Sequence, residues 1–155
     1  MRIVIAAVGR LRQGPEAALI ADYLERHAKA GRALGLPPVT VVEVEDKRGG
    51  GMAAEAPLLM RAIPEGAALV ILDERGQMLS SPELAAGIAG FRDQARDIAF
   101  VIGGADGIDP ALRARADLAI SFGRMVWPHM LVRVMLAEQI YRATTILAGS
   151  PYHRV

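Results

Sequence analysis

Short apolar runs without polar alternation recur along this chain, and they constrain its fold more than any other feature. They are separated by segments whose composition is typical of helices. The predicted strands are residues 2–8, 38–46, 67–74, 97–104 and 118–123. The predicted helices are residues 14–31, 53–62, 82–96, 110–116 and 128–147. Apolar strands that alternate with helices indicate an α/β fold, in which helices cover both faces of a mostly parallel sheet.

The composition is typical of a folded protein rather than a disordered one. Of the 155 residues, 52% are hydrophobic and 23% are charged, which fits a single domain over residues 1–155. The first apolar run, IVIAAV, is too short for a signal peptide or a membrane span, so we expect a cytoplasmic protein with no membrane partner. The sequence has no cysteine, which excludes disulfides, thiolate zinc sites and a cysteine nucleophile.

The charge pattern neither requires nor excludes an RNA partner. The formal net charge is +1, whereas a nonspecific nucleic-acid binder usually has a larger basic excess. Lys29 and Lys47 are the only lysines, and the other basic side chains are arginines, which suit bidentate recognition of phosphate or carboxylate. The KRGGG segment at residues 47–51 is predicted to be a flexible, basic loop.

Three loops of unusual composition, DERGQMLSS, GGADG and FGRMVWP, follow predicted strands. Ligands of parallel sheets bind outside the carboxyl ends of the strands. Gly103, Gly104 and Gly107 fit either a tight turn or a backbone cradle for a nucleotide-like cofactor, although they match neither the dinucleotide motif nor the P-loop. Asp73 and Glu74 are candidates for acid or base chemistry, but an exposed charged turn is the commoner interpretation.

The predicted helix 128–147 is the longest, and it is apolar on nearly every side. Such a helix must be buried, and burial against a second copy of the chain predicts a homodimer. Glu138 and Arg142 are four residues apart, which predicts a salt bridge within the helix. Trp127, just before the helix, is interpreted as a packing residue.

Two of the three histidines are the better functional candidates. His129 and His153 flank the long helix, whereas His27 is predicted to lie on a solvated helix face. None of them has the neighbours of a metal ligand in the sequence, so no metal site is predicted.

Four blocks of the sequence together resemble the RlmH family of SPOUT-class methyltransferases. The blocks are LDERG, FVIGGADG, MVWPHMLVRVMLAEQIYRA and PYHR, and they occur in family order along nearly the whole chain. The resemblance implies a SPOUT (α/β-knot) fold with a deep C-terminal trefoil knot, although protein chains are rarely knotted. It also implies an S-adenosylmethionine-dependent homodimer that methylates N3 of a pseudouridine in 23S rRNA on assembled ribosomes.

The resemblance implies cofactor contacts along three segments. The matching residues are Leu72, Gly103, Phe122, Gly123, Arg124, Met125, Val126 and Trp127. The sequence departs from the family at two of these positions. The family often has threonine in place of Val126 and a smaller apolar residue in place of Trp127.

The chemistry of the implied reaction points to further residues. N3 of the base carries a proton, so the site needs a base or a cation that stabilises the developing anion. The candidate catalytic residues are Arg154, His129 and His153, and the candidate RNA-binding residues are Arg142, Tyr152 and Arg154. Three other interpretations stay open: a SPOUT enzyme with another RNA target, a catalytically silent ribosome-binding dimer, and a flavodoxin-like binder of a small nucleotide.

Overall fold

Five parallel strands form one sheet in the computed structural model, which describes residues 1–154. The strands are β1 (Ile3–Val8), β2 (Val39–Val44), β3 (Ala68–Gln77), β4 (Ile98–Ile102) and β5 (Leu118–Ile120). Their order across the sheet is β2-β1-β4-β3-β5, and every neighbouring pair is parallel. The predicted parallel sheet is therefore confirmed.

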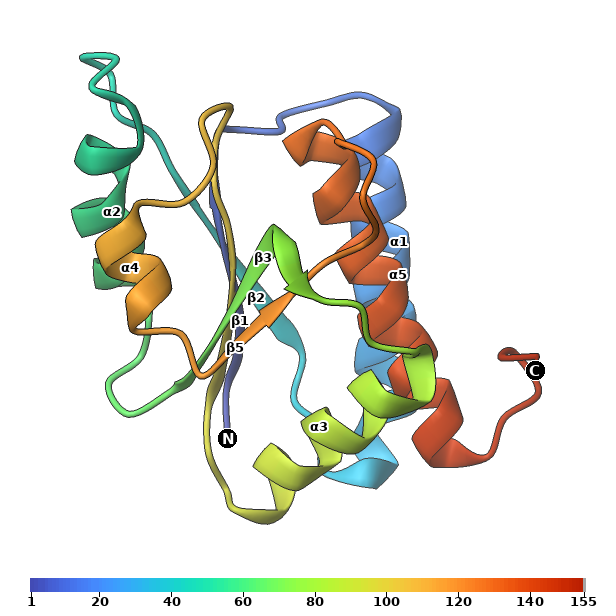
Figure 1. Ribbon diagram of the computed structural model, residues 1–155. Helices are drawn as coiled ribbons and strands as arrows, with labels where there is room; N and C mark the ends of the chain where they lie inside the picture. The colour runs from blue at the N-terminus through green and yellow to red at the C-terminus, as the bar shows by residue number, and fades with distance from the viewer. Residues whose placement is uncertain (155) are drawn as a thin grey trace.

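Helices cover both faces of this sheet, as predicted (Figure 1). They are α1 (Pro15–Gly31), α2 (Gly51–Ala62), α3 (Ser81–Asp93), α4 (Pro110–Ala114) and α5 (His129–Ala148), with a short 3₁₀ helix, η1 (Arg32–Leu34), after α1. α2 and α4 lie on one face, while α1, α3 and α5 lie on the other. Alternate residues of β1 follow this division, because Ile3 and Ile5 pack with Leu136 of α5 whereas Ala6 packs with Leu59 of α2.

The end of β3 packs closely against β5. β3 continues to Gln77, beyond the predicted end of the strand, and its pairing with Ile120 shifts in register. Gly76 lies so close to β5 that a Cβ atom there would be 2.6 Å from the carbonyl carbon of Ala119. The amide of Ser121 then donates to the carbonyl of Gln77 at 2.8 Å. The knot implied by the resemblance stays a prediction.

The prediction that His27 lies on a solvated helix face is wrong. Its side chain is fully buried between α1 and α5. Nδ1 lies 2.7 Å from the hydroxyl of Thr144, and Nε2 lies 2.8 Å from the carbonyl of Pro37. Burial lowers the pKa of His27, which favours the neutral imidazole. Its neighbours Glu25 and Lys29 are charged and exposed. In the sequence these neighbours make His27 look exposed as well.

Candidate cofactor site and C-terminal tail

A cavity of about 290 Å³ opens at the carboxyl ends of β3, β4 and β5. The three loops that the sequence singled out meet there, as expected for ligand sites in parallel sheets. Seven of the eight residues predicted to contact the cofactor line the cavity, together with His129; these seven are Leu72, Gly103, Phe122, Gly123, Met125, Val126 and Trp127. Arg124 is exposed and is not among the lining residues.

The glycine loop after β4 makes a turn that larger residues cannot form. A Cβ atom on Gly103 would lie 2.5 Å from the carbonyl oxygen of Gly107. The amide of Gly107 donates to the carbonyl of Gly104 at 3.1 Å, and the φ of Gly107 is 87°, in the left-handed region. The tight turn, one of the two interpretations of these glycines, is confirmed, and it places main-chain atoms at the cavity wall.

The loop between β5 and α5 forms the most exposed part of the wall. Ser121 fixes its start, because its hydroxyl donates to the carbonyl of Gly123 at 2.9 Å and accepts from the amide of Gly123 at 3.1 Å. Met125 and Val126 are 73% and 81% exposed, and Trp127 is 40% exposed. Trp127 therefore does not act as a buried packing residue within the described chain, contrary to the interpretation of the sequence.

The charged corner of the cavity differs from the exposed turn that the sequence predicts, because one carboxylate in it is nearly enclosed. The side chain of Asp73 is 7% exposed and lies 2.7 Å from Nε of Arg113. Its Oδ1 also accepts from the amide of Arg75 at 2.9 Å. Burial alone would raise the pKa of Asp73, but the hydrogen bonds from Arg75 and the charge of Arg113 together lower it. A carboxylate stabilised in this way is a weak base, so Asp73 braces the wall rather than moving protons.

His129 begins α5 and lies over the end of β1. A Cβ atom on Gly9 would be 3.5 Å from Nε2 of His129. One turn later, Arg133 is 2% exposed, and its Nη1 donates to Glu43 at 2.6 Å. Nη2 of Arg133 donates to the carbonyl of Gly9 at 3.1 Å. This buried ion pair, which the sequence analysis missed, ties α5 to β1 and β2 and thereby positions His129 at the cavity.

The C-terminal tail packs against the other end of α5 through a network centred on Glu138. Oε1 of Glu138 accepts from Arg142 at 2.6 Å, which confirms the predicted salt bridge, and from the hydroxyl of Tyr152 at 2.9 Å. Arg142 also approaches Nδ1 of His153 at 3.1 Å, and because arginine only donates, Nδ1 is the acceptor. The Tyr152 ring lies 4.7 Å from that of Tyr141. Tyr152, His153 and Arg142 are thus brought together.

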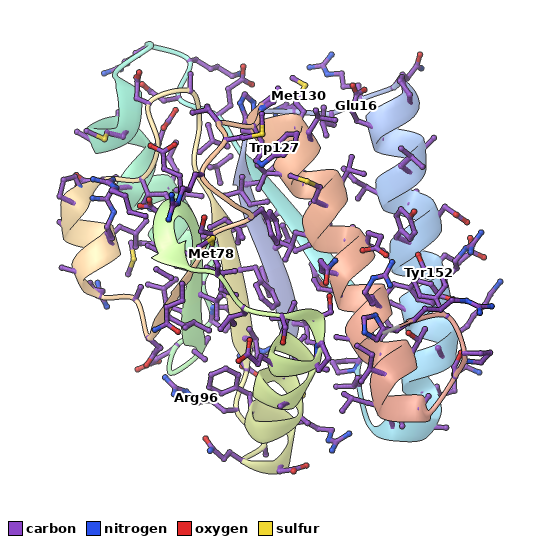
Figure 2. All side chains as sticks on the ribbon, turned by 45° about the vertical axis from the view of Figure 1, so that its right-hand side comes forward. Glu16, Met78, Arg96, Trp127, Met130 and Tyr152 are labelled. Carbon is purple, nitrogen blue, oxygen red and sulfur yellow. The ribbon has the colours of Figure 1, made fainter. Side chains whose placement is uncertain are left out.

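The structure does not bring this tail to the cavity of its own chain. With a rise of about 1.5 Å per residue, His129 and Arg142 lie about 20 Å apart along α5. Figure 2 shows Trp127 and Met130 near one end of α5 and Tyr152 toward the other. Arg154 is exposed. The candidate catalytic residues therefore fall into two groups, with His129 at the cavity and His153 and Arg154 in the tail.

Among residues 1–154, no group of three or more His, Cys, Asp or Glu side chains is arranged to hold a metal ion. None of the helices in this range is long and apolar enough to cross a membrane.

Comparison with known proteins identifies the class of protein to which this fold belongs. A family model described as predicted SPOUT methyltransferase matches residues 1–153. A probable methylase family protein from Haemophilus influenzae Rd KW20 has a related fold, with a TM-score of 0.50 and 13% identity, over 99% of this chain and 70% of that chain. The class is therefore that of the SPOUT methyltransferases.

Sequence relatives narrow the class further. The ribosomal RNA large subunit methyltransferase H of Paracoccus denitrificans (strain Pd 1222) is 88% identical over 99% of both chains. The protein of the same name from Roseobacter denitrificans (strain ATCC 33942 / OCh 114) is 70% identical over 99% of both chains. The chain belongs to the SPOUT methyltransferase family and, within it, to the ribosomal RNA large subunit methyltransferase H group. The predicted resemblance and the predicted enzyme class are confirmed, and the flavodoxin-like interpretation is wrong.

Proposed function

We propose that this protein transfers a methyl group from S-adenosylmethionine to N3 of a pseudouridine in 23S rRNA within the assembled ribosome. One observation carries the proposal. The chain is 88% identical, over 99% of its length, to a protein named for methylation of large-subunit ribosomal RNA. The cavity supports it, because the three loops that line it are those in which the family resemblance lies. A ribosomal substrate places the protein in the cytoplasm.

The residues of the cavity fit the cofactor. Its volume of about 290 Å³ is near the lower end of small-molecule pockets, about 300–1,000 Å³. Apolar side chains such as Leu72 and Phe122 offer a wall for an adenine ring, and the glycine loop offers main-chain donors and acceptors. The ion-paired corner at Asp73 and Arg113 suits the charged amino-acid end. When bound, S-adenosylmethionine supplies an electrophilic methyl group, so the protein must position the acceptor and manage its proton.

His129 is the base in this proposal, and Arg154 stabilises the anion that forms on the ring. His129 lines the cavity, where it can take the N3 proton directly or through one water molecule. Asp73 is unsuited to that task because its pKa is lowered. His153 is secondary, since its Nδ1 is occupied by Arg142. Tyr152 is the residue proposed to stack on the target base.

We further propose that the working unit is a homodimer whose sites combine both chains. Apolar side chains are exposed beside the cavity, and a contiguous exposed patch of this kind marks an interface. They are Met125, Val126, Trp127, Met130 and Leu131. Because the tail lies about 20 Å along α5 from its own cavity, a twofold dimer with antiparallel α5 helices would bring each tail to the partner's cavity.

Mixed dimers test this arrangement. A His129→Ala chain and a chain that ends at Pro151 should each be inactive as homodimers. If the site is composite, the mixed dimer holds one complete site and recovers about half of the wild-type activity. If tail and cavity act within the same chain, mixing recovers nothing.

The reaction itself is tested by mass spectrometry of the methylated RNA. Purified protein, labelled S-adenosylmethionine and ribosomes from cells that lack the protein should give 3-methylpseudouridine in 23S rRNA. Naked rRNA and tRNA serve as alternative acceptors, and a better reaction with either would favour a different RNA target. Absence of methyl transfer to every acceptor would overturn the proposed activity.

A further inference from the structure

Two loops outside the cavity carry exposed cations on the same edge of the sheet. The loop after β1 holds Arg12, and the loop after β2 holds Lys47 and Arg48. Because the strands are parallel, both loops leave the carboxyl edge, where the cavity opens; they lie at the top of Figure 1 with the glycine loop. The two loops are in contact, since Nε of Arg10 in the first loop lies 3.2 Å from Oε2 of Glu45 in the second.

Three carboxylates in or beside these loops are already engaged. Oδ2 of Asp46 accepts from the amide of Gly50 at 2.6 Å, which closes the loop on itself. Glu45 pairs with Nε of Arg10 at 3.2 Å. Glu43 pairs with the buried Arg133. Their negative charge is therefore largely used within the protein.

Arg12, Lys47 and Arg48, which we call the basic rim, remain available. No carboxylate lies within 4.0 Å of their cationic groups in the part of the chain that the structure describes. The basic rim is a local concentration of positive charge, because the whole chain has a net charge of only +1. On the side of the cavity, the rim ends at two carboxylates, Glu55 and Asp106. Burial, followed by the charge of Asp106, raises the pKa of Glu55.

We propose that the basic rim binds the phosphate backbone of RNA beside the target nucleotide, an inference that rests on the proposed function. Phosphate contacts need long, exposed cations, and a glycine-containing loop lets them adapt to the spacing of the phosphates. Neither loop carries an aromatic residue, so the rim has no platform for stacking bases. The rim therefore positions the RNA, while the cavity and tail act on the target.

The opposite edge of the sheet supplies a matched control. Arg32, Arg61 and Arg115 precede β2, β3 and β5, so they lie at the amino edge. They are exposed and, among residues 1–154, have no carboxylate within 4.0 Å. A rim variant (Arg12→Gln, Lys47→Gln, Arg48→Gln) and an edge-control variant (Arg32→Gln, Arg61→Gln, Arg115→Gln) thus remove the same charge from opposite edges.

Two measurements compare these variants with the wild type. One is the KM for ribosomes in methyl transfer, and the other is ribosome binding by co-sedimentation, each over a series of salt concentrations. For the rim variant we expect binding weaker by about tenfold at moderate salt, and a slope of log affinity against log salt that is smaller by about 2–3. The edge-control variant should remain within about twofold of the wild type, and cofactor affinity by calorimetry should be unchanged in both.

The outcomes separate this inference from the proposed function. Equal ribosome binding by the rim and edge-control variants, whether both are weakened or both unchanged, overturns the role of the rim. If the wild type binds ribosomes but does not methylate them, the proposed function fails, while co-sedimentation still decides the role of the rim. If the wild type does not bind ribosomes at all, the inference is overturned as well.

Discussion

The two ends of α5 are built on different physical principles. At the amino end, the cavity wall consists largely of main chain and apolar side chains, and its shape depends on close contacts such as that between Gly103 and Gly107. At the carboxyl end, the tail is fixed by polar side chains that converge on Glu138. Substitutions that enlarge a side chain should therefore disturb the amino end, whereas substitutions that remove a hydrogen-bonding group should disturb the carboxyl end.

Removal of the tail should have the largest effect on activity, while the chain still folds and binds the cofactor. A chain that ends at Pro151 loses residues 152–155, which include Tyr152, His153 and Arg154. Because a positioned acid, base or cation contributes roughly 10²- to 10⁴-fold, we expect methyl transfer to fall by that factor. Single-turnover rates on ribosomes measure the loss, and thermal unfolding and calorimetry with the cofactor are the controls. An unchanged rate would show that the tail has no part in the reaction.

The next largest effect should come from breaking the ion pair between Arg133 of α5 and Glu43 of β2. Arg133→Met leaves Glu43 without its partner, so we expect the free energy of unfolding to fall by about 3 kcal/mol. Burial raises the pKa of Glu43, but hydrogen bonds from Leu11 and Arg133 lower it overall. The stabilisation is therefore present above the ordinary pKa and is lost as the pH falls through the folded-state value.

Urea unfolding at neutral and acidic pH measures this effect. The difference between Arg133→Met and the wild type should shrink as Glu43 becomes protonated. Arg26→Met is the matched control, because its pair with Asp22 is exposed and screened by water, so its loss should barely change stability. Similar losses in the two variants would show that the buried pair has no special weight.

A single added methyl group should disturb the cavity by a smaller amount. In Gly103→Ala, the Cβ atom would overlap the backbone of Gly107, so we expect a loss of about 1–3 kcal/mol in stability and weaker cofactor binding. Gly87→Ala is the control, because nothing lies within 4 Å of its Cβ position and it is inside α3. That variant should be stabilised by about 0.5–1 kcal/mol. Equal melting temperatures would contradict the close contact at Gly103.

The smallest effect should be a shift in one titration at the tail. Burial, followed by the hydrogen bond to Glu138, raises the pKa of Tyr152 to about 12 from 10.0. Its contribution to stability is thus fully present below pH 10.0 and is lost as the pH rises toward 12. In Glu138→Gln the pKa should move toward the ordinary value, as followed by tyrosinate absorbance. Glu25→Gln, remote on α1, should leave the titration unchanged. If the pKa of Tyr152 does not move in Glu138→Gln either, Tyr152 is not part of the network around Glu138.

Much of the sequence analysis agrees with the structure where the signal is local. The five strands and the helices between them follow from apolar runs, glycines and prolines that are close in the chain. The cavity was also predictable, since parallel strands bring their carboxyl ends together. All eight cofactor contacts stay predictions, as do the catalytic roles of His129, His153 and Arg154.

The failures concern residues whose surroundings come from distant segments. His27 is buried because α5 lies against α1, and its partner Thr144 is 117 positions away in the chain. Asp73 is enclosed by Arg113 from α4, which the sequence alone did not connect with it. In the sequence both residues have charged neighbours, so composition indicates exposure.

By itself, then, the sequence determined the alternation of strands and helices, the loops that form the cavity and the family resemblance, because each depends on local patterns. Only the tertiary structure decided that Arg133 pairs with Glu43 across 90 positions and that the tail lies at the far end of α5 from its own cavity. Such contacts depend on how helices pack on the sheet, which the spacing of residues along a chain does not encode.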